Sequence, residues 1–244
     1  MTPRVVFGVP VFNKAAYLEE SIGSLLAQSF RELAVVLIDD RSEDETVAVA
    51  RRIAARDGRL EVYVNERRLG MLDNTRRALE LSRRRFPEAE YWALGSDHDV
   101  WKPTFAERLV ALLDAHSEAV LACPLSERID ARGEPFPGAK PPRGFDTLGV
   151  TGPRERMHAA FAGMSAGSMI YGLFRASALD ELGHYRSVLV PDRLLLSELA
   201  LRGAFAQEPA VLWCRRFRGL AELERQRLAS VSYTHLTLPT TPYV

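Results

Sequence analysis

The sequence predicts an α/β fold in which a mostly parallel, mixed sheet is sandwiched between helices. From residue 4 to residue 125, short β-branched runs alternate with segments of helical periodicity in the order β-α-β-α-β-α-β-α-β. Elements that alternate in this way form a sheet covered on both faces, with right-handed crossovers between the strands. The chain has 244 residues, 47% of them hydrophobic, which is enough to fill such a core.

The strands of this first half are apolar runs that end in turn residues or carboxylates. They are expected at residues 4–12, 33–40, 60–64, 91–95 and 119–125. The helices between them are expected at residues 14–30, 43–55, 71–85 and 105–115. Ser42, with Glu45 three residues later, predicts a capping box for the second helix. Thr104 with Glu107 predicts the same start for the fourth helix.

The second half of the chain is less regular. Residues 127–156 are rich in Pro and Gly, and a loop of this length is usually functional or disordered. Beyond it, strands are expected at residues 167–175 and 210–217, and helices at residues 176–182 and 191–203. Asp192 is placed to cap the last helix and Gly203 to end it.

The bulk composition limits the classes of partner and of compartment. Lys+Arg and Asp+Glu both total 32, so the zero net charge gives no reason to expect nucleic acid or an anionic membrane as a partner. Cys123 and Cys214 lie in apolar runs, which favours buried, reduced thiols and a cytoplasmic location over a disulfide. No apolar run reaches the ~18 residues of a membrane span, and the first ten residues do not form a secretion signal.

The end of the chain differs in composition from the rest. The segment "VSYTHLTLPTTPYV", residues 231–244, has no charged side chain in a chain that is 26% charged. It is either a disordered terminal tail or a translated laboratory sequence, because residues 231–240 match in order the translation of a transposase sequencing adapter. We therefore expect residues 230–244 to be a non-native tail, and residues 1–229 to form one domain whose C-terminal part is truncated.

Polar residues follow the ends of the predicted strands. They are Asn13, Asp39, Asp40, Asn65, Asp97 and Asp99. Ligands of parallel sheets bind outside the carboxyl ends of the strands, so these side chains are candidates for a site. No glycine-rich dinucleotide or phosphate loop is present, and a bound diphosphate would therefore need a metal to neutralise it. Asp97-His98-Asp99 supplies the oxygen ligands that Mg²⁺ or Mn²⁺ accepts; the alternative is a solvated loop.

Four of these segments together resemble the start of the family 2 glycosyltransferases, which have the GT-A fold with a Rossmann-like sheet. They are "VVFGVPVFNKAAYLEESIGSLLAQSF", "VVLIDDRSEDET", "NERRLG" and "SDHDVWKP", in this order over residues 5–103. A looser match continues through "PDRLLLSELALRGAFAQEPAVLW". The resemblance implies a metal-dependent, inverting transferase that moves a sugar from a nucleoside diphosphate, UDP in the first instance, to an acceptor hydroxyl. The expected cofactor is Mn²⁺ or Mg²⁺.

The resemblance also implies where the nucleotide binds. Residues 1–125 would be the nucleotide-binding half and residues 126–229 the acceptor half. Pro10, Phe12 and Asp40 would hold the base, with Asn13 beside them at the exit of the first strand. The Asp40 carboxylate can accept a hydrogen bond from a uracil imide N–H, although a role as a loop cap is the alternative. Asp39 is expected to accept from the backbone of the following turn.

The remaining donor contacts follow from the same resemblance. Glu19 matches an acidic position on the first helix, with a plain surface residue as the alternative. Arg76 lies near a nucleotide-contacting position and can meet a phosphate, with a solvated basic face as the alternative. Asp97 would hold the ribose hydroxyls or share the metal, and Asp99 would be the principal metal ligand.

The catalytic base implied by the resemblance is Asp192. The family commonly has a Glu-Asp pair at this position, and here only Pro191-Asp192 remains. As a base, Asp192 would take the proton of the acceptor hydroxyl; as a plain N-cap it would contribute ~1 kcal/mol to the stability of the helix. Residues 127–165 would cover the donor and shape the acceptor pocket.

Three points remain open from the sequence. The acceptor can be a saccharide, a lipid-linked molecule or a protein, and a peripheral membrane association is compatible with each. A nucleotide-sugar-binding module without catalysis is the main alternative, because the acidic pair is incomplete. A sugar nucleotidyltransferase is disfavoured, since the first loop has no glycine-rich, basic segment to hold a triphosphate.

Overall fold

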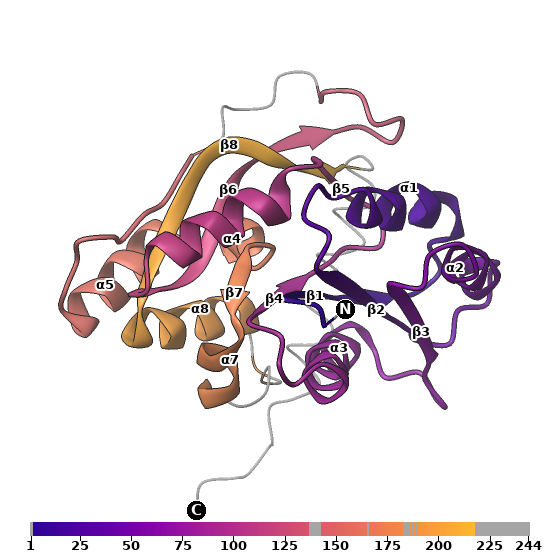
Figure 1. Ribbon diagram of the computed structural model, residues 1–244, viewed down its shortest axis with the longest axis horizontal. Helices are drawn as coiled ribbons and strands as arrows, with labels where there is room; N and C mark the ends of the chain where they lie inside the picture. Colours follow the sequence, from indigo (N-terminus) through magenta and orange to yellow (C-terminus); the bar gives the residue numbers. More distant parts are fainter. Residues whose placement is uncertain are drawn as a thin grey trace, which may run out of the picture.

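The computed structural model contains one eight-stranded sheet in the order β3-β2-β1-β4-β7-β6-β8-β5 (Figure 1). It describes residues 2–136, 143–164, 166–182, 186, 188 and 190–217. The strands are β1 Val5–Val11, β2 Leu33–Asp39, β3 Leu60–Val64, β4 Tyr91–Leu94, β5 Val100–Trp101, β6 Ala119–Ile129, β7 Leu173–Arg175 and β8 Ala204–Arg216. The helices are α1 Ala15–Leu26, α2 Thr46–Ala54, α3 Met71–Arg85, α4 Phe105–Ala115, α5 Pro153–Gly163, α6 Ala166–Met169, α7 Ala176–Leu182 and α8 Pro191–Arg202.

The pairing confirms a mixed, mostly parallel sheet. Strand β1 lies between β2 and β4 and is parallel to both, and β2 is parallel to β3. Strand β7 is antiparallel to both β4 and β6 and therefore joins the two halves of the sheet. Strand β8 runs parallel to β6 and antiparallel to the short β5. The β5 segment directly follows the Asp97-His98-Asp99 motif, so the pairing with β8 carries the end of the chain to that motif.

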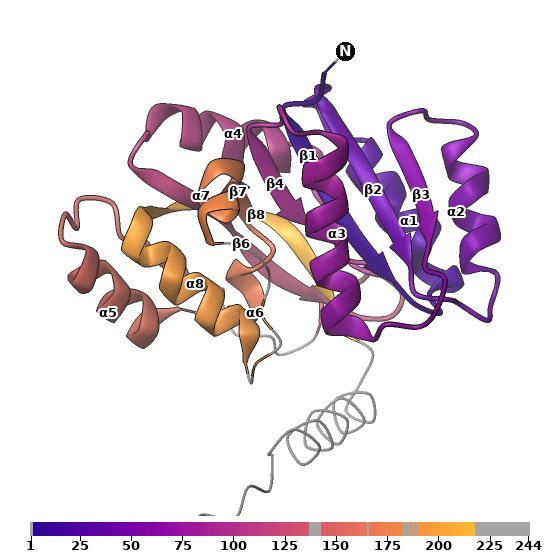
Figure 2. The ribbon, with the colours of Figure 1, turned by 90° about the horizontal axis from the view of Figure 1, so that it is seen from below.

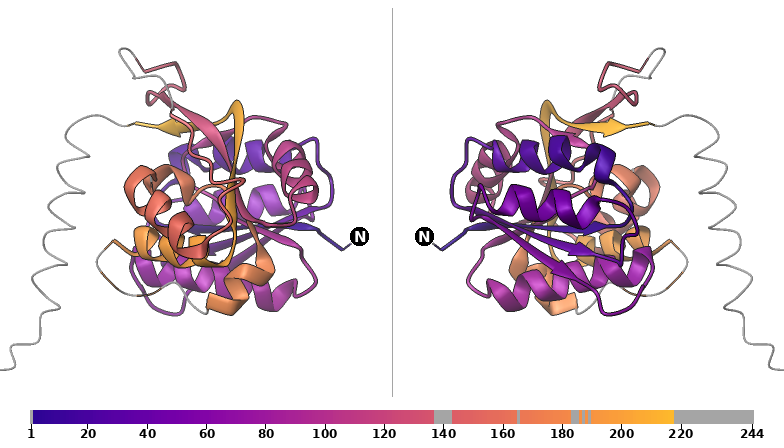
Figure 3. Two further views of the ribbon diagram at one scale, coloured as in Figure 1. Left: turned by 90° about the vertical axis from the view of Figure 1, so that its left-hand side faces the viewer. Right: turned by 90° about the vertical axis from the view of Figure 1, so that its right-hand side faces the viewer.

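The two faces of the sheet bury two separate cores. Alternate residues of β1 point to opposite faces: Val5, Phe7 and Val9 belong to the core that contains residues of α1, α2 and α4, whereas Val6 belongs to the core that contains residues of α3 and α8. Figure 1 shows α1 and α2 on the opposite side of the central strands from α3, and Figure 2 shows α3, α7 and α8 on their common side. The end-on views of Figure 3 show the same layers. Because both faces are buried, the central strands are continuous apolar runs, as the sequence shows.

Replacing two glycines by alanine tests this packing, because one change should lower the stability of the protein and the other should raise it. A Cβ on Gly8 of β1 would lie 2.9 Å from the Trp92 ring and 3.2 Å from the Ala78 carbonyl, so Gly8→Ala should destabilise the protein by about 1–3 kcal/mol. A Cβ on Gly23 of α1 would meet nothing within 4 Å, so Gly23→Ala should stabilise the helix by roughly 0.5–1 kcal/mol. Urea unfolding of both variants measures the difference. A Gly8→Ala variant as stable as the wild type would contradict this packing.

The second half of the chain departs from the predicted elements. The strand expected at residues 167–175 is wrong: Ala166–Met169 form the helix α6, and only Leu173–Arg175 pair as β7. An apolar run of this length has the same pattern in a buried helix as in a strand, and Met169 and Ile170 are buried next to α8 residues. The irregular segment expected at residues 127–156 is partly wrong as well, because β6 continues to Ile129 and α5 begins at Pro153.

The predicted helix starts are also corrected. Helix α2 begins at Thr46, and Ser42 accepts a hydrogen bond from the Asn13 backbone instead of forming a capping box with Glu45. Thr104 is the N-cap residue of α4 but makes no side-chain cap hydrogen bond. Helix α8 begins at Pro191 with Val190 as its N-cap residue, so Asp192 does not cap the helix and lies inside its first turn. Gly203 ends α8 as predicted.

Two sequence expectations concern the outside of this fold. Among the described residues, no helix is both long and apolar enough to cross a membrane. The expected non-native tail, residues 230–244, lies outside the described residues.

Candidate active site

The site is built at the edge where parallel strands end. Strands β3, β2, β1 and β4 are neighbours and run in the same direction, so their carboxyl ends share one edge of the sheet. The polar residues predicted from the strand exits follow these ends directly. The topology therefore places the segments that carry Asp40, Asn65 and Asp97 along one rim.

Asp40 organises the loop after β3. Its carboxylate is buried and accepts hydrogen bonds from the Leu69 N–H at 2.7 Å, the Gly70 N–H at 2.8 Å and the Asn65 side chain at 2.9 Å. Gly70 has a φ of +86°, a conformation that favours glycine. The side chain of Asn65 also donates to Asn74 of α3 at 2.9 Å. These bonds fix the loop over the strand ends, so contact of Asp40 with a nucleotide base stays a prediction.

Asp39, the preceding residue, has the role expected from the sequence. One carboxylate oxygen accepts a hydrogen bond from the Ser42 backbone N–H at 2.9 Å, which confirms that Asp39 holds the turn after β2. The side chain is fully buried, and its other oxygen has no hydrogen-bond partner among the described residues. A buried acceptor without a hydrogen-bond partner lowers the stability of the fold, so this oxygen partly offsets the stabilisation that the Ser42 bond gives to the turn.

The exit of β1 carries the other residues predicted to hold the base. Asn13 adopts a left-handed φ of 51°, which asparagine tolerates, and its side chain accepts a hydrogen bond from the Glu43 backbone N–H at 2.8 Å. Phe12 is half-buried, and the guanidinium of Arg68 lies 3.9 Å from the centre of its ring. Pro10 is the half-buried residue of β1 two positions before Phe12. The aromatic ring of Phe12 is therefore held at the rim by the loop that Asp40 fixes.

Glu19 and Arg76 make contacts typical of surface residues. Glu19 of α1 forms ion pairs with Arg52 at 3.2 Å and Arg56 at 3.6 Å, both from α2. Arg76 of α3 pairs with Asp73 of the same helix at 2.9 Å. The described contacts bring neither residue to the other predicted site residues, and their contact with a donor stays a prediction.

The Asp97-His98-Asp99 loop is packed more tightly than a solvated loop. Asp99 is 2% exposed, and burial raises the pKa of its carboxyl above the ordinary value while the hydrogen bonds that it accepts oppose that shift. The ring of His98 hydrogen-bonds to the side chain of Asp97, and its other nitrogen lies 3.7 Å from Asp99. Ser96 completes the loop by contacting His98 at 3.2 Å. The two carboxylates are therefore close together and joined through the imidazole.

A divalent cation fits this donor set only if it shares its ligands with a substrate. Among the described residues, no group of three or more His, Cys, Asp or Glu is arranged to hold a metal. Asp97 and Asp99 nevertheless provide carboxylate oxygens, which Mg²⁺ and Mn²⁺ prefer. Mg²⁺ is commonly bound through one or two carboxylates together with water and substrate phosphates. Asp97 and Asp99 would therefore hold such a cation together with water or substrate oxygens.

Arg216, at the end of β8, clamps this loop from the other half of the chain. Its backbone N–H donates to Asp99 at 2.8 Å, and its Nε donates to the carbonyl of His98 at 2.8 Å. The side chain of Arg216 is 1% exposed. The other contacts of the guanidinium are with the carbonyls of Asp130 and Ala131, the carboxylate of Glu20 and the ring of Tyr17.

Asp192 reaches the same region from α8. Burial raises the pKa of Asp192 to about 6, and the positive charge of Arg215 partly opposes that shift. The buried hydroxyl of Tyr171 has a raised pKa, because burial and the negative charges of Asp99, Asp192 and Asp97 all disfavour its ionised form. These carboxylates come from two segments, the Asp97-His98-Asp99 loop and α8, and their charges act on one hydroxyl. The predicted base and the predicted metal ligands thus influence the same side chain, and their catalytic roles stay predictions.

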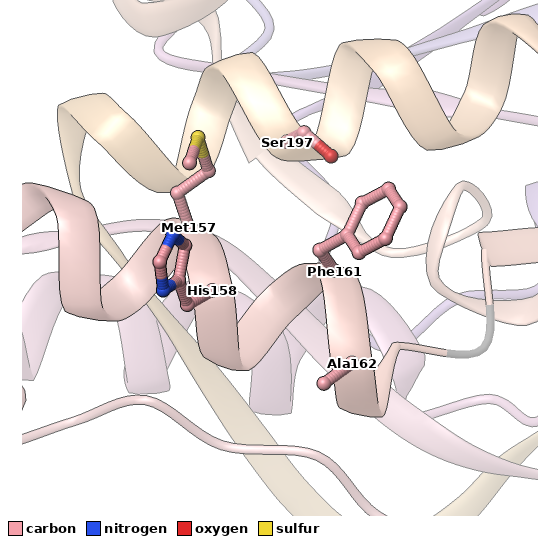
Figure 4. Close-up of a pocket in the computed structure, with 5 residues that line it drawn as sticks. All are labelled: Met157, His158, Phe161, Ala162 and Ser197. Atoms are coloured by element: carbon pink, nitrogen blue, oxygen red, sulfur yellow. The ribbon is translucent and has the colours of Figure 1, made fainter.

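A shallow apolar pocket lies beside this region, between α5 and α8. It has a volume of about 490 Å³ and is lined by Met157, His158, Phe161 and Ala162 of α5 and Ser197 of α8; Figure 4 shows Met157 and Phe161 extending toward α8. Phe161 is 60% exposed, and its ring is 5.4 Å from the guanidinium of Arg193. Phe161 of the pocket thus contacts the residue that directly follows Asp192 in α8.

A comparison with protein-family models shows the family to which the chain belongs. The model of the family described as "Glycosyl transferase family 2" matches residues 7–183. The chain belongs to glycosyltransferase family 2. The match runs from within β1 to the end of α7 and confirms the family predicted from the sequence motifs. Helix α8 and strand β8, which carry Asp192 and Arg216, follow its last residue.

Individual relatives of this family 2 chain cover parts of it. An uncharacterized glycosyltransferase of Haemophilus influenzae is 28% identical over 112 residues, which is 46% of this chain and 33% of that protein. The GalNAc(5)-diNAcBac-PP-undecaprenol beta-1,3-glucosyltransferase of Campylobacter jejuni is 33% identical over 64 residues, which is 26% of this chain and 21% of that protein. The matched segments thus span a third or less of these two relatives.

Solved structures of similar fold support the architecture of this family 2 chain. S. aureus TarS 1–349 in complex with UDP-GlcNAc has a TM-score of 0.67 at 21% identity, covering 90% of this chain and 60% of that one. The mannosyltransferase PcManGT from Pyrobaculum calidifontis, in complex with GDP-Man and Mn²⁺, has a TM-score of 0.66 at 18% identity. That alignment covers 99% of this chain and 66% of the mannosyltransferase. At these identities the likeness shows the fold.

The family 2 site also contains residues that the sequence reasoning missed. Tyr171, Arg215 and Arg216 contact or influence the predicted carboxylates, and none is a polar residue at the exit of a parallel strand in the first half. A usable signal was present in the charged pair that ends the apolar strand "AVLWC", since a strand that closes in Arg215-Arg216 faces polar surroundings there. Tyr171 lies within an apolar run and carries no such signal.

Proposed function

We propose that the protein transfers a sugar from a nucleoside diphosphate to an acceptor hydroxyl with inversion of the anomeric configuration, in a metal-dependent reaction. The observation that carries the proposal is the pair of carboxylates after β4, where the ring of His98 hydrogen-bonds to Asp97 and lies 3.7 Å from Asp99. These two carboxylates can hold a cation, and Asp192 of α8, whose pKa burial raises to about 6, is suited to act as a base near neutral pH. The family membership supports the reaction class.

The proposed donor is a nucleotide sugar, with UDP favoured over GDP. Structures of similar fold bind UDP-GlcNAc in one case and GDP-Man with Mn²⁺ in another, which supports the donor class and a divalent cation. We assign the base to Pro10, Phe12, Asn13 and Asp40, and the ribose to Asp97. The Asp40 carboxylate accepts three hydrogen bonds from the loop after β3, and a carboxylate offers about four acceptor sites, so one remains for a base N–H.

The chemical step requires a base and a stabilised leaving group. Asp192 accepts the proton of the acceptor hydroxyl while that oxygen attacks the anomeric carbon. The bond from the anomeric carbon to the diphosphate breaks in the same displacement, which inverts the configuration. A bound Mg²⁺ or Mn²⁺ would supply Lewis-acid stabilisation of the departing diphosphate. Asp97 and Asp99 would hold that cation, and Arg216 keeps Asp99 in position.

The assay for this function measures donor cleavage directly. The protein is incubated with Mn²⁺, UDP- or GDP-sugars and a panel of saccharide, lipid-linked and protein acceptors, and the release of UDP or GDP is followed. Transfer with inversion, read by NMR of the product, supports the proposal. Nucleotide binding with neither transfer nor hydrolysis over the whole panel would favour the binding module. Pyrophosphate formation from a nucleoside triphosphate and a sugar phosphate would favour the nucleotidyltransferase.

The metal assignment has its own test in Asp99→Asn. The amide oxygen still accepts the Arg216 N–H, but the negative charge is lost, so we expect Mn²⁺-dependent UDP binding to weaken roughly 10- to 100-fold. Isothermal titration with Mn²⁺ and with EDTA measures the effect, and the two proteins should not differ in EDTA. If Mn²⁺ increased the UDP affinity of the variant as much as that of the wild type, Asp99 would not be a metal ligand.

We also propose that residues 1–229 form a single domain, with residues 1–125 serving the nucleotide and residues 126–229 the acceptor. The joining of the two halves of the sheet through β7 supports this division. The pocket of Phe161 and Ser197 on the acceptor side supports the second assignment, since it lies on the helix that carries Asp192.

A further inference from the structure

Arg215 lies near several acidic groups but forms an ion pair with none of them in the described part of the chain. No hydrogen bond or ion pair joins its guanidinium to another residue in the described part of the chain. Its positive charge nevertheless lowers the pKa values of Asp99, Tyr171 and Asp192 against the effect of burial. An arginine that is near three acidic groups and paired with none of them has its donors available for a ligand.

The strand register fixes where Arg215 points. Strand β5 pairs with β8 in antiparallel register, with Trp101 opposite Trp213 and Val100 opposite Cys214. One step further along the same register, Asp99 comes opposite Arg215. Trp213, which shares a strand face with Arg215, stacks on Tyr171 at 4.6 Å. Arg215 therefore lies on the Tyr171 side of β8, between the metal-binding loop and α8.

A second arginine lies directly beside it. In the parallel register of β6 and β8, Arg128 is the partner of Arg215, so both side chains leave the same face of the sheet, and both are exposed. Like charges directly opposite on neighbouring strands are destabilising unless an anion lies between them. Gly167 of α6 leaves room at this point, because a Cβ there would lie 3.9 Å from a terminal nitrogen of Arg215.

We propose that Arg215, assisted by Arg128, binds the diphosphate of the donor and stabilises it as the leaving group. The inference rests on the proposed transferase function and adds the residues that hold the departing anion. A planar guanidinium fits two phosphate oxygens at once, and two arginines complement the negative charge of a diphosphate. Asp97 and Asp99 would hold a cation that neutralises more of that charge. A site with three carboxylates would otherwise repel this anion.

These groups account for every bond, electron pair and proton that changes in the transfer. The acceptor oxygen forms a bond to the anomeric carbon as the bond from that carbon to the β-phosphate oxygen breaks. The electron pair of the broken bond stays on the β-phosphate oxygen, next to the guanidinium of Arg215. The proton of the acceptor hydroxyl moves to Asp192. Arg215 thus stabilises negative charge that increases in the transition state.

The test compares nucleotides that differ only in the second phosphate. The affinities of the wild type for UDP and UMP, or for GDP and GMP if it binds guanine nucleotides, are measured with saturating Mn²⁺. We expect Arg215→Met to lower the diphosphate affinity 10- to 100-fold and the monophosphate affinity by less than threefold. Arg128→Met should give a smaller loss in the same direction. Arg215→Lys should recover part of the loss, because it restores the charge without the planar fork.

The controls separate this inference from the proposed function. Arg51→Met removes an exposed arginine on α2 and should change neither affinity. Since Arg215 is exposed, its variants should keep the wild-type melting temperature. A wild type that binds neither UDP nor GDP would refute the proposed function itself. Two results would refute the role of Arg215 without touching the proposed function. In the first, Arg215→Met and the wild type bind the diphosphate with equal affinity. In the second, the variant loses affinity equally for the diphosphate and the monophosphate.

Discussion

Asp192→Asn should abolish sugar transfer and leave nucleotide binding intact. The amide cannot accept the proton of the acceptor hydroxyl, and loss of a general base costs typically 10²- to 10⁴-fold in rate. The side chain keeps its size in the first turn of α8, so the fold should not change. Steady-state kinetics of donor consumption give the rate, and titration with UDP gives the affinity, which should remain within about twofold of the wild type.

The pH dependence identifies Asp192 more specifically than the loss of rate. Burial raises its pKa to about 6, and only the ionised form acts as a base. The kcat/KM of the wild type should therefore increase tenfold per pH unit below about pH 6 and level off above it. Glu198→Gln, which removes a carboxylate from the same helix, should keep this profile. A wild-type profile that is flat from pH 5 to pH 8 would exclude Asp192 as the base.

The same raised pKa has a consequence for stability. The folded protein binds the Asp192 proton more tightly than the unfolded chain, whose carboxyl has the ordinary pKa of 3.8, so stability decreases as pH rises from about 4 to about 6. At pH 7 the buried charge costs on the order of 1–3 kcal/mol. Asp192→Asn should therefore be more stable than the wild type at pH 7 and equally stable at pH 4. Urea unfolding at the two pH values measures both differences.

The first half of the fold could be predicted because its signals are local. The central strands are buried on both faces and appear as unbroken apolar runs, and the helices between them carry a clear apolar stripe. Parallel strands also place their exits at one edge, so Asp40, Asn65 and Asp97 could be grouped without coordinates. Asp39 could be assigned to its turn, since a carboxylate at a strand end commonly accepts from the backbone that follows.

The second half could not be predicted in the same way, because long-range pairing decides its structure. The run at residues 167–175 is divided between a helix and a strand by contacts with β4, β6 and α8. Helix α5 did carry a start signal in Pro153 with Glu155, but its weak amphipathic pattern gave no further support. The contact of Arg216 with Asp99 joins residues 117 positions apart, and no sequence spacing indicates such a contact.

Arg216→Met should be the most destabilising single change among the site residues. The guanidinium is 1% exposed and donates to three backbone carbonyls and to the carboxylate of Glu20. Methionine fills a similar volume but leaves these acceptors without their donors. Breaking a buried charge network by removing one partner costs about 3–5 kcal/mol, and we place Arg216 near the lower value because Glu20 is half-exposed. The urea midpoint should decrease accordingly, with an unchanged m-value.

Arg215→Met is the matched control, because it removes the same type of side chain from the adjacent position. Arg215 faces the Tyr171 side of β8, whereas Arg216 faces the loop of His98 and the helix of Glu20. We expect the two variants to separate: Arg215→Met loses diphosphate affinity at wild-type stability, and Arg216→Met loses stability. Mn²⁺-dependent UDP binding should also weaken in Arg216→Met below its unfolding transition, since the carbonyl of His98 loses its side-chain donor while Asp99 keeps only the backbone N–H. If both variants had the wild-type urea midpoint, Arg216 would not position this loop.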